Sequence, residues 1–367
     1  MISNTLFQRF APIEPAVSEQ LDMLRGFCTA VVLFGHAYLV FLYPIWPVVM
    51  LPLYLFGHSC VMAFFALSGF LICKSVSYNI HKNHTFKIKP YIISRSNRIL
   101  PPFYLGCVVL VALYLIAPYF FANGTREITI ISNTMTQAKM ELSVEGFVGV
   151  LLFINGFITE TPPSNFAFWS LPFEIWFYAL FGLLMLPRNR VCAVIGVTLL
   201  IILSLLNYTF FLYALIWCSG VIAALLHNHQ YNIRRSRLIL SFSLIAGLLV
   251  LLAIVGSLYF PATFDKQKYL LALYGTLCGI IFCYLFYLMS FHRVHFYLPG
   301  KQLTPSSYTI YILHFPLLIF IYGIIQPYIY KNTWVLLGST FLIATSIMFI
   351  GLWVGRYVEK LKPFSRI

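Results

Sequence analysis

Arg25 and His36 are the two residues of this sequence whose types and spacing most clearly indicate chemistry. They lie eleven positions apart in the apolar stretch Leu21–Tyr43. An α-helix has 3.6 residues per turn and rises 1.5 Å per residue, so both side chains lie on one face, about 16 Å apart along the axis. An ionisable side chain at membrane depth is costly and usually faces a bundle interior or a watery cavity. The spacing therefore predicts a cation at the cytoplasmic mouth of a helix bundle and a titratable imidazole near the membrane centre.

Each of these two residues also has a simpler structural explanation. Asp22 lies three residues before Arg25, a spacing at which the two side chains can form an ion pair where the helix enters the membrane. A single histidine in an apolar span is often a buried residue with satisfied hydrogen bonds. A catalytic interpretation of His36 therefore depends on further polar groups at the same depth.

Glu174 is one such group. In FWSLPFEIWFYALF, Ser170, Glu174 and Tyr178 recur every four residues and are predicted to share one helix face. Pro172 between them removes a backbone hydrogen bond and predicts a bend in the span. Glu174 either acts directly or as an orienting group in catalysis, or it neutralises a buried histidine or arginine of another helix.

A second group of polar side chains begins a later span, in SSYTIYILHFPLL. Tyr311 and His314 lie within one turn there and are predicted, with Ser170 and Tyr178, to contact a polar substrate. A structural role for His314 is the alternative. Arg95 and Arg98, three residues apart, suit bidentate binding of phosphate groups. Ordinary anchoring by positive charge at the cytoplasmic surface explains the two arginines equally well.

The elements that position these residues are membrane-spanning helices. Hydrophobic residues make up 60% of the 367 and charged residues only 9%, and the apolar residues fall in blocks of the length that crosses a bilayer. The sequence predicts an all-α integral membrane protein of about ten transmembrane helices in a single domain, residues 1–367. The predicted spans are residues 21–43, 48–73, 99–121, 166–186, 191–206, 209–226, 238–260, 269–291, 306–330 and 333–355. Residues 122–165 form the longest predicted extracytoplasmic connection, whose apolar segment Gly146–Ile158 is too short to span the membrane.

The basic residues set the predicted orientation. A net charge of +14 is compatible with nucleic-acid binding, but Lys and Arg occur in short loops between apolar spans, which is typical of membrane topology and excludes a nucleic-acid partner. Both termini are therefore predicted to be cytoplasmic. The eight cysteines form no CxxC pair, and we expect no metal site. The predicted cytoplasmic connections are Lys74–Arg98, Arg188–Arg190, His227–Arg237, His292–Lys301 and the tail from Arg356.

Five segments together resemble the motifs of the bacterial acyltransferase-3 family of membrane O-acyltransferases, in order and spacing. The resemblance covers the chain from about Leu21 to Gly355, and its most specific pieces are the Arg25–His36 and Arg95–Arg98 pairs. Met23 departs from the family pattern, where glycine is frequent. The five segments are LDMLRGFCTAVVLFGHA, FFALSGFLI, ISRSNRILPPFY, FWSLPFEIWFY and SSYTIYILHFPL.

The resemblance implies a ten-helix enzyme of the bacterial inner membrane. Family members take an acyl group, usually acetyl, from cytoplasmic acyl-coenzyme A as a co-substrate, and no tightly bound cofactor is expected. They commonly acylate sugar hydroxyls of lipopolysaccharide O-antigen, exopolysaccharide, Nod factor, peptidoglycan or macrolides, so the expected acceptor is a cell-surface glycan or a lipid-linked sugar. Larger members add an extracytoplasmic SGNH-type domain, which we do not expect here. By position, the resemblance makes His36 the catalytic histidine, Arg25 its essential partner, Arg95 and Arg98 donor-binding residues, and Glu174 part of the active-site motif.

The chemistry of these residues fits such a transfer. A sugar hydroxyl needs a base to attack a thioester, and histidine has a suitable pKa of about 6.5 in its unperturbed state. Our hypothesis is that His36 deprotonates the acceptor while Glu174 or Asp22 orients nearby groups. A covalent acyl-histidine is an alternative. A rival function that uses the same intramembrane residues is a proton-coupled transporter or flippase of a lipid-linked sugar or solute. A third interpretation, a structural subunit of polysaccharide assembly, predicts that neither His36 nor Glu174 is needed. The residues expected to hold the phosphates of coenzyme A are Arg25, Arg95 and Arg98.

Overall fold

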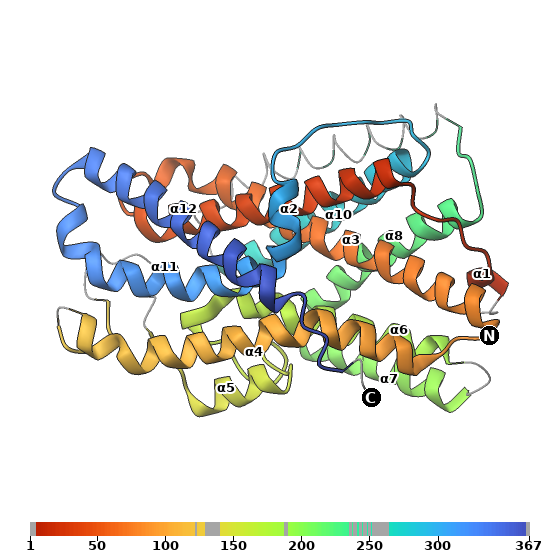
Figure 1. Cartoon of the computed structure of the whole chain (residues 1–367), viewed down its shortest axis with the longest axis horizontal. Helices are drawn as coiled ribbons and strands as arrows, with labels where there is room; N and C mark the ends of the chain where they lie inside the picture. The colour runs from red at the N-terminus through yellow and green to blue at the C-terminus, as the bar shows by residue number, and fades with distance from the viewer. Residues whose placement is uncertain are drawn as a thin grey trace. The chain divides into compact units, whose positions relative to one another are not determined.

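The regular structure of the chain is helical throughout the part that the structure describes (Figure 1). This computed structural model describes residues 5–121, 123–128, 140–186, 190–234 and 264–364, together with positions 237, 241, 244, 248 and 251. The α-helices are α1 (Thr5–Gln8), α2 (Pro15–Ala37), α3 (Met50–Asn83), α4 (Ile88–Phe120), α5 (Val144–Leu151), α6 (Leu171–Met185), α7 (Arg190–Leu206), α8 (Tyr208–Asn228), α10 (Phe264–Ser290), α11 (Ser307–Ile329) and α12 (Thr333–Val358). A π-helix, η1 (Tyr38–Leu42), continues α2, and the 3-10 helices are η2 (Pro47–Val49), η3 (Pro163–Ser170) and η4 (Lys301–Ser306).

The predicted class, an all-α integral membrane protein, is confirmed. Among the described residues, eight helical segments are long and apolar enough to cross a membrane, and they match eight of the predicted spans. Predicted span 191–206 corresponds to the shorter apolar helix α7. Predicted span 238–260 lies outside the described residues apart from four single positions. The eight segments are Pro15–Leu42, Pro47–Asn83, Ile88–Phe120, Pro163–Met185, Tyr208–Asn228, Leu273–Ser290, Lys301–Ile329 and Thr333–Val358.

The long predicted connection Lys74–Arg98 is wrong in its extent. Helix α3 continues to Asn83 and α4 begins at Ile88, so only residues 84–87 connect them. The prediction marked where the apolar residues stop, whereas backbone hydrogen bonding carries a helix beyond the hydrocarbon layer. Lys74 is 4% exposed and donates hydrogen bonds to Ala11 O (3.1 Å), Asn228 Oδ1 (2.7 Å) and His227 Nδ1. It is therefore a buried, hydrogen-bonded residue and not a loop cation.

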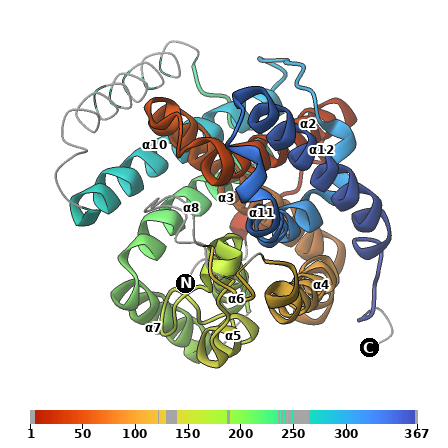
Figure 2. The same ribbon diagram turned by 90° about the vertical axis from the view of Figure 1, so that its left-hand side faces the viewer.

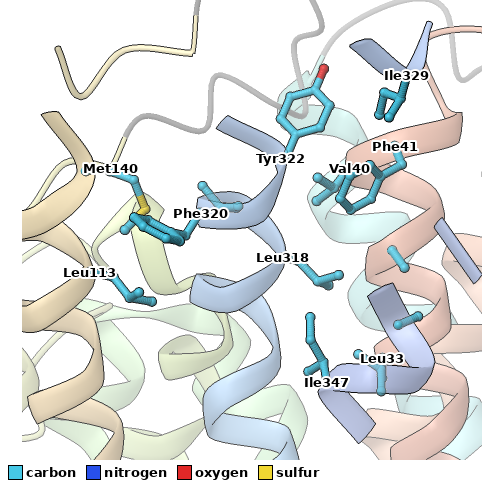
Figure 3. Packing of buried hydrophobic residues seen from close by; sticks show 14 of the residues in the cluster. Leu33, Val40, Phe41, Leu113, Met140, Leu318, Phe320, Tyr322, Ile329 and Ile347 are labelled. Atoms are coloured by element: carbon cyan, nitrogen blue, oxygen red, sulfur yellow. The ribbon is translucent and has the colours of Figure 1, made fainter. Parts of the chain in front are cut away.

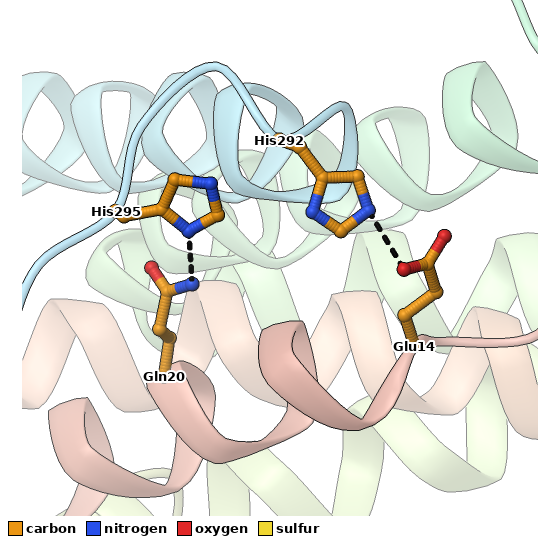
Figure 4. A network of polar contacts seen from close by, with 4 residues as sticks. All are labelled: Glu14, Gln20, His292 and His295. Atoms are coloured by element: carbon orange, nitrogen blue, oxygen red, sulfur yellow. Dashed lines mark hydrogen bonds and ion pairs between the residues drawn. The ribbon is translucent and has the colours of Figure 1, made fainter.

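The described chain forms two compact units. Unit 1 comprises residues 1–24, 58–91 and 173–298, and unit 2 comprises residues 25–57, 92–172 and 299–367. In unit 1, α8 packs against α7 and α10. Two histidines there hold the start of α2 to the segment after α10: His292 forms an ion pair with Glu14 (3.0 Å), and Gln20 donates to His295 Nδ1 (3.2 Å) (Figure 4).

The core of unit 2 lies around α11. Helix α11 packs along α12 and against η3. Helices α11 and α12 lie side by side in both views (Figures 1 and 2). Buried side chains from α2, α11 and α12, among them Leu33, Leu318 and Ile347, form one cluster (Figure 3). Lipid tails are as apolar as leucine, so close packing rather than transfer from water stabilises such contacts. The cluster fixes α2 against α11, the two helices that carry His36 and His314.

Candidate active site

His36 and His314 form a direct hydrogen bond within unit 2. His36 Nδ1 lies 2.8 Å from His314 Nε2, and the two rings are stacked with centroids 5.0 Å apart. The rings of Phe315 and His36 meet in a T-shaped arrangement, with centroids 5.2 Å apart. His36 is partly exposed, whereas His314 is completely buried behind it. The π-helix η1 begins two residues after His36, and such segments occur frequently at functional sites.

A backbone carbonyl fixes which ring nitrogens carry protons. His314 Nδ1 lies 3.1 Å from the carbonyl oxygen of Ile310, and because a carbonyl only accepts hydrogen bonds, this nitrogen is the donor. With both rings neutral, His314 Nε2 then has the lone pair and accepts a hydrogen bond from His36 Nδ1–H. His36 Nε2 is left as the unprotonated nitrogen of the pair, the state that a general base requires. Both nitrogens of His314 are thus engaged, which favours positioning of His36 over direct substrate contact.

Ser170 and Tyr311 lie in the same unit and contact each other. Their hydroxyl oxygens are 2.8 Å apart, and both side chains are buried. The Tyr311 ring lies 5.8 Å from that of His314 between centroids. Ser170, Tyr311, His314 and His36 therefore form one continuous polar cluster of η3, α11 and α2.

Asn165 holds η3 against α11 through a carbonyl that a proline leaves unpaired. Pro316 has no N–H, so Ile312, four residues earlier, loses its intrahelical donor. Asn165 is completely buried and donates from Nδ2 to Ile312 O (3.1 Å). The same arrangement occurs in helix α4. Pro118 leaves the carbonyl of Tyr114 without its intrahelical donor, and Arg126 Nε donates to that carbonyl (2.9 Å). Side chains from outside the helix thus satisfy two proline-freed carbonyls.

Replacement of Asn165 by alanine is expected to destabilise the protein by about 1–3 kcal/mol, because Ile312 O becomes a buried acceptor without a donor. In a Pro316→Ala background the restored backbone N–H supplies that donor, so the same change is expected to cost about 1 kcal/mol less. Thermal unfolding of the four proteins of this double-mutant cycle measures the coupling. Additive effects would contradict the assigned role of Asn165.

The positive charges of Arg25 and Arg98 act on Glu359 in unit 2. Glu359, one residue beyond α12, accepts hydrogen bonds at Oε1 from Thr309 N (2.8 Å) and Thr309 Oγ1 (2.9 Å). Burial raises the pKa of Glu359, while the bonds from Thr309 and the charges of Arg98 and Arg25 lower it in part. Arg95, one turn before Arg98, donates to Ser94 Oγ (3.2 Å). Arg25 and Arg98 therefore act electrostatically on the same carboxylate, which was not among the predicted site residues.

Glu174 and Tyr178 belong to unit 1, where they meet Ser68 and Trp217. Tyr178 OH donates to Glu174 Oε1, and Ser68 Oγ lies 3.0 Å from Tyr178 OH and 3.5 Å from Glu174 Oε1. Trp217 Nε1 donates to Ser68 Oγ (3.2 Å). Two hydroxyl groups, of Tyr178 and Ser68, thus donate to one carboxylate inside a predicted membrane span, and Trp217 donates to one of these hydroxyls. Because Glu174 belongs to unit 1 and His36 to unit 2, their joint action stays a prediction.

Four residues of these clusters were not among the predicted site residues. The sequence contained a signal for Asn165, because Pro316 within a span leaves the carbonyl of Ile312 in need of a hydrogen-bond donor from outside the helix. Glu359 had a weaker one, because it is an acidic residue directly after a span. Trp217 had none, since its partner lies far away in sequence, whereas Ser68 belongs to FFALSGFLI, one of the five segments that carry the family resemblance. In the described residues, no three His, Cys, Asp or Glu side chains are grouped as a metal site would need.

Comparison with known proteins gives one match. Residues 18–356 match a family model described as an acyltransferase domain. This segment contains every predicted site residue and ends three positions before Glu359. Neither a curated protein nor a solved structure is similar enough to the chain to count as a match.

Proposed function

Because the chain belongs to the acyltransferase-3 family of membrane O-acyltransferases, we propose that it transfers an acetyl group from acetyl-coenzyme A to a hydroxyl of a cell-surface glycan or lipid-linked sugar. The observation that carries the proposal is the hydrogen-bonded series from His36 through His314 to the Ile310 carbonyl. It leaves His36 Nε2 free to accept a proton beside a partly exposed face. The proposed location is the bacterial inner membrane.

The proposed reaction needs one base and one acid, and His36 serves as both. His36 Nε2 takes the proton of the acceptor hydroxyl as its oxygen attacks the thioester carbonyl carbon. The carbon–sulfur bond then breaks, and the same nitrogen returns the proton to the departing thiolate. The products are an O-acyl ester and free coenzyme A. While His36 carries two protons, its Nδ1–H donates to His314, whose own Nδ1–H is held by the Ile310 carbonyl.

The remaining polar residues bind and orient the substrates in this proposal. Ser170 and Tyr311 are buried hydroxyl groups next to His314 and suit a polar acceptor. Glu174 with Tyr178 supplies a second hydroxyl-binding group in unit 1. Arginine forks match phosphate groups, so Arg25, Arg98 and the nearby Arg95 hold the phosphates of coenzyme A at the cytoplasmic side.

Binding of coenzyme A tests the donor, and we expect Arg98→Ala to weaken it at least tenfold because one guanidinium–phosphate contact is lost. The measurement is the rise in unfolding temperature of the purified protein with increasing coenzyme A, which reports the affinity. Arg234→Ala removes an exposed arginine of unit 1 and is expected to bind like the wild-type protein.

Two results would overturn the donor assignment. One is wild-type protein that coenzyme A does not stabilise; the other is equal binding by the Arg98 and Arg234 variants. Stabilisation by a sugar lipid alone would instead favour transport. The acyl group and the acceptor are identified by mass spectrometry of surface glycans from cells with and without the gene: a mass increment equal to one added acetyl group supports acetyl transfer.

A further inference from the structure

Glu359 occupies a position that the proposed donor site leaves unexplained. It lies outside the matched residues 18–356, so membership in the family assigns it no role. Its carboxylate nevertheless lies in the electrostatic field of Arg25 and Arg98, two of the residues proposed to hold phosphate. A carboxylate close to phosphate-binding arginines is an unfavourable neighbour for a phosphate group.

The Glu359 carboxylate is held in place and cannot simply move aside. Oε1 accepts two hydrogen bonds from Thr309, which is completely buried in the first turn of α11. The Glu359 backbone N–H donates to Gly355 O (3.0 Å), which continues the last turn of α12. A Cβ added at Gly355 would lie 2.4 Å from Ser306 Cβ, so α12 packs closely on the last residue of η4, directly before α11.

The residues next to the two arginines contact the same region of unit 2. Gly26, next to Arg25, touches the turn at Gly300, where an added Cβ would lie 1.8 Å from Gly300 O. Gly300 has a φ of 117°, a conformation that favours glycine. Asn97, next to Arg98, accepts a hydrogen bond at Oδ1 from Phe364 N (2.9 Å), which ties the tail after α12 to α4. These contacts bring the chain segments that carry Arg25, Arg98 and Glu359 together around the start of α11.

We propose that Glu359 is a built-in competing anion of the donor site, which limits the affinity of Arg25 and Arg98 for the phosphate groups of acyl-coenzyme A so that coenzyme A leaves after transfer. The inference rests on the proposed function. Acyl-coenzyme A and coenzyme A carry the same phosphates, so tighter phosphate binding stabilises substrate and product alike. It does not speed the chemical step, and it slows product release.

Glu359→Gln tests the charge with little change in shape, because the amide oxygen still accepts both bonds from Thr309. We expect the dissociation constant for coenzyme A to fall about tenfold, as one nearby negative charge is removed. KM for acetyl-coenzyme A is expected to fall, and kcat to fall with it as release becomes limiting. Pantetheine, which lacks the phosphates, is expected to bind both proteins equally.

Two further variants separate charge from folding. Glu14→Gln removes one negative charge in unit 1, from the exposed ion pair with His292, and is expected to leave coenzyme A affinity unchanged. Glu359→Asp keeps the charge and is expected to stay within about threefold of the wild-type affinity. If the aspartate variant instead binds as tightly as the glutamine variant, shape and not charge is responsible, and the inference is overturned.

The remaining outcomes are also decisive. Unchanged or weaker coenzyme A binding by Glu359→Gln, or an equal gain for pantetheine, overturns the competing anion. If the wild-type protein binds coenzyme A through Arg98 and only the Glu359 result is negative, the proposed function stands without this inference. If the wild-type protein does not bind coenzyme A at all, both are overturned.

Discussion

Replacement of His36 by asparagine is expected to lower kcat for acyl transfer by about 10²–10⁴-fold, the contribution typical of a general base. The asparagine amide N–H can occupy the position of the imidazole Nδ1–H and donate to His314 Nε2, so the buried partner keeps its hydrogen bond. What disappears is the free nitrogen that accepts the hydroxyl proton. Coenzyme A affinity is expected to stay near the wild-type value, because the phosphate-binding residues are untouched. Radiolabelled acetyl transfer in membranes of equal protein content measures the loss.

A matched control lies one residue away. Gly35→Ala changes the same turn of α2, and the added methyl group meets no atom within 4 Å. We expect this variant to keep wild-type activity, since alanine also suits a helix interior better than glycine. Full activity of the His36 variant would remove the proposed base, and equal losses in both variants would indicate a general disturbance of α2.

The apolar blocks of the sequence were sufficient to predict the helices and their order, but they did not predict where helices end. A transmembrane prediction follows the change from apolar to polar residues, whereas a helix stops where its backbone loses hydrogen-bond partners. Lys74 illustrates the difference. Its charge predicted a loop, yet acceptors at Ala11, His227 and Asn228 allow the lysine to stay buried within α3. None of these three acceptors is close to Lys74 in the sequence.

The sequence indicated candidate side chains one by one, but it did not indicate how they are grouped. Helical spacing placed Ser170, Glu174 and Tyr178 on one face. In the structure η3 ends at Ser170 and α6 begins at Leu171, so a regular period does not extend across them. Ser170 contacts Tyr311, while Tyr178 contacts Glu174 and Ser68. Periodicity describes a single helix, and partners on other helices depend on packing that it does not contain.

The contact between His36 and His314 also depends on packing between helices. Each histidine, taken alone in an apolar span, is compatible with a buried structural residue. Only the packing of α2 on α11 brings their nitrogens within 2.8 Å, and only the Ile310 carbonyl determines the direction of the hydrogen bond. The sequence therefore indicated two titratable side chains, and the structure indicates which nitrogen of which ring is available for chemistry.

The direction of the hydrogen bond from His36 to His314 predicts a large effect of replacing His314. His314→Leu is expected to lower kcat by about 10²-fold, with KM for acetyl-coenzyme A unchanged. Leucine fills similar space but accepts no hydrogen bond, so nothing holds the proton of His36 on Nδ1. The ring then spends part of its time with the proton on Nε2, where it cannot act as a base, and it loses the group that orients it.

His314→Gln distinguishes positioning from packing. The glutamine side-chain oxygen can accept the Nδ1–H of His36, so this variant is expected to lose only about tenfold. Nitrogen NMR of histidine-labelled protein provides a second measurement, because it identifies the protonated ring nitrogen: His36 is expected to be protonated at Nδ1 in the wild-type and glutamine proteins and at both positions in exchange in the leucine protein. Equal activity losses in the two variants, with the His36 signal unchanged, would show that His314 merely fills space. A graded loss that follows the nitrogen signal assigns it to setting the protonation state of the base.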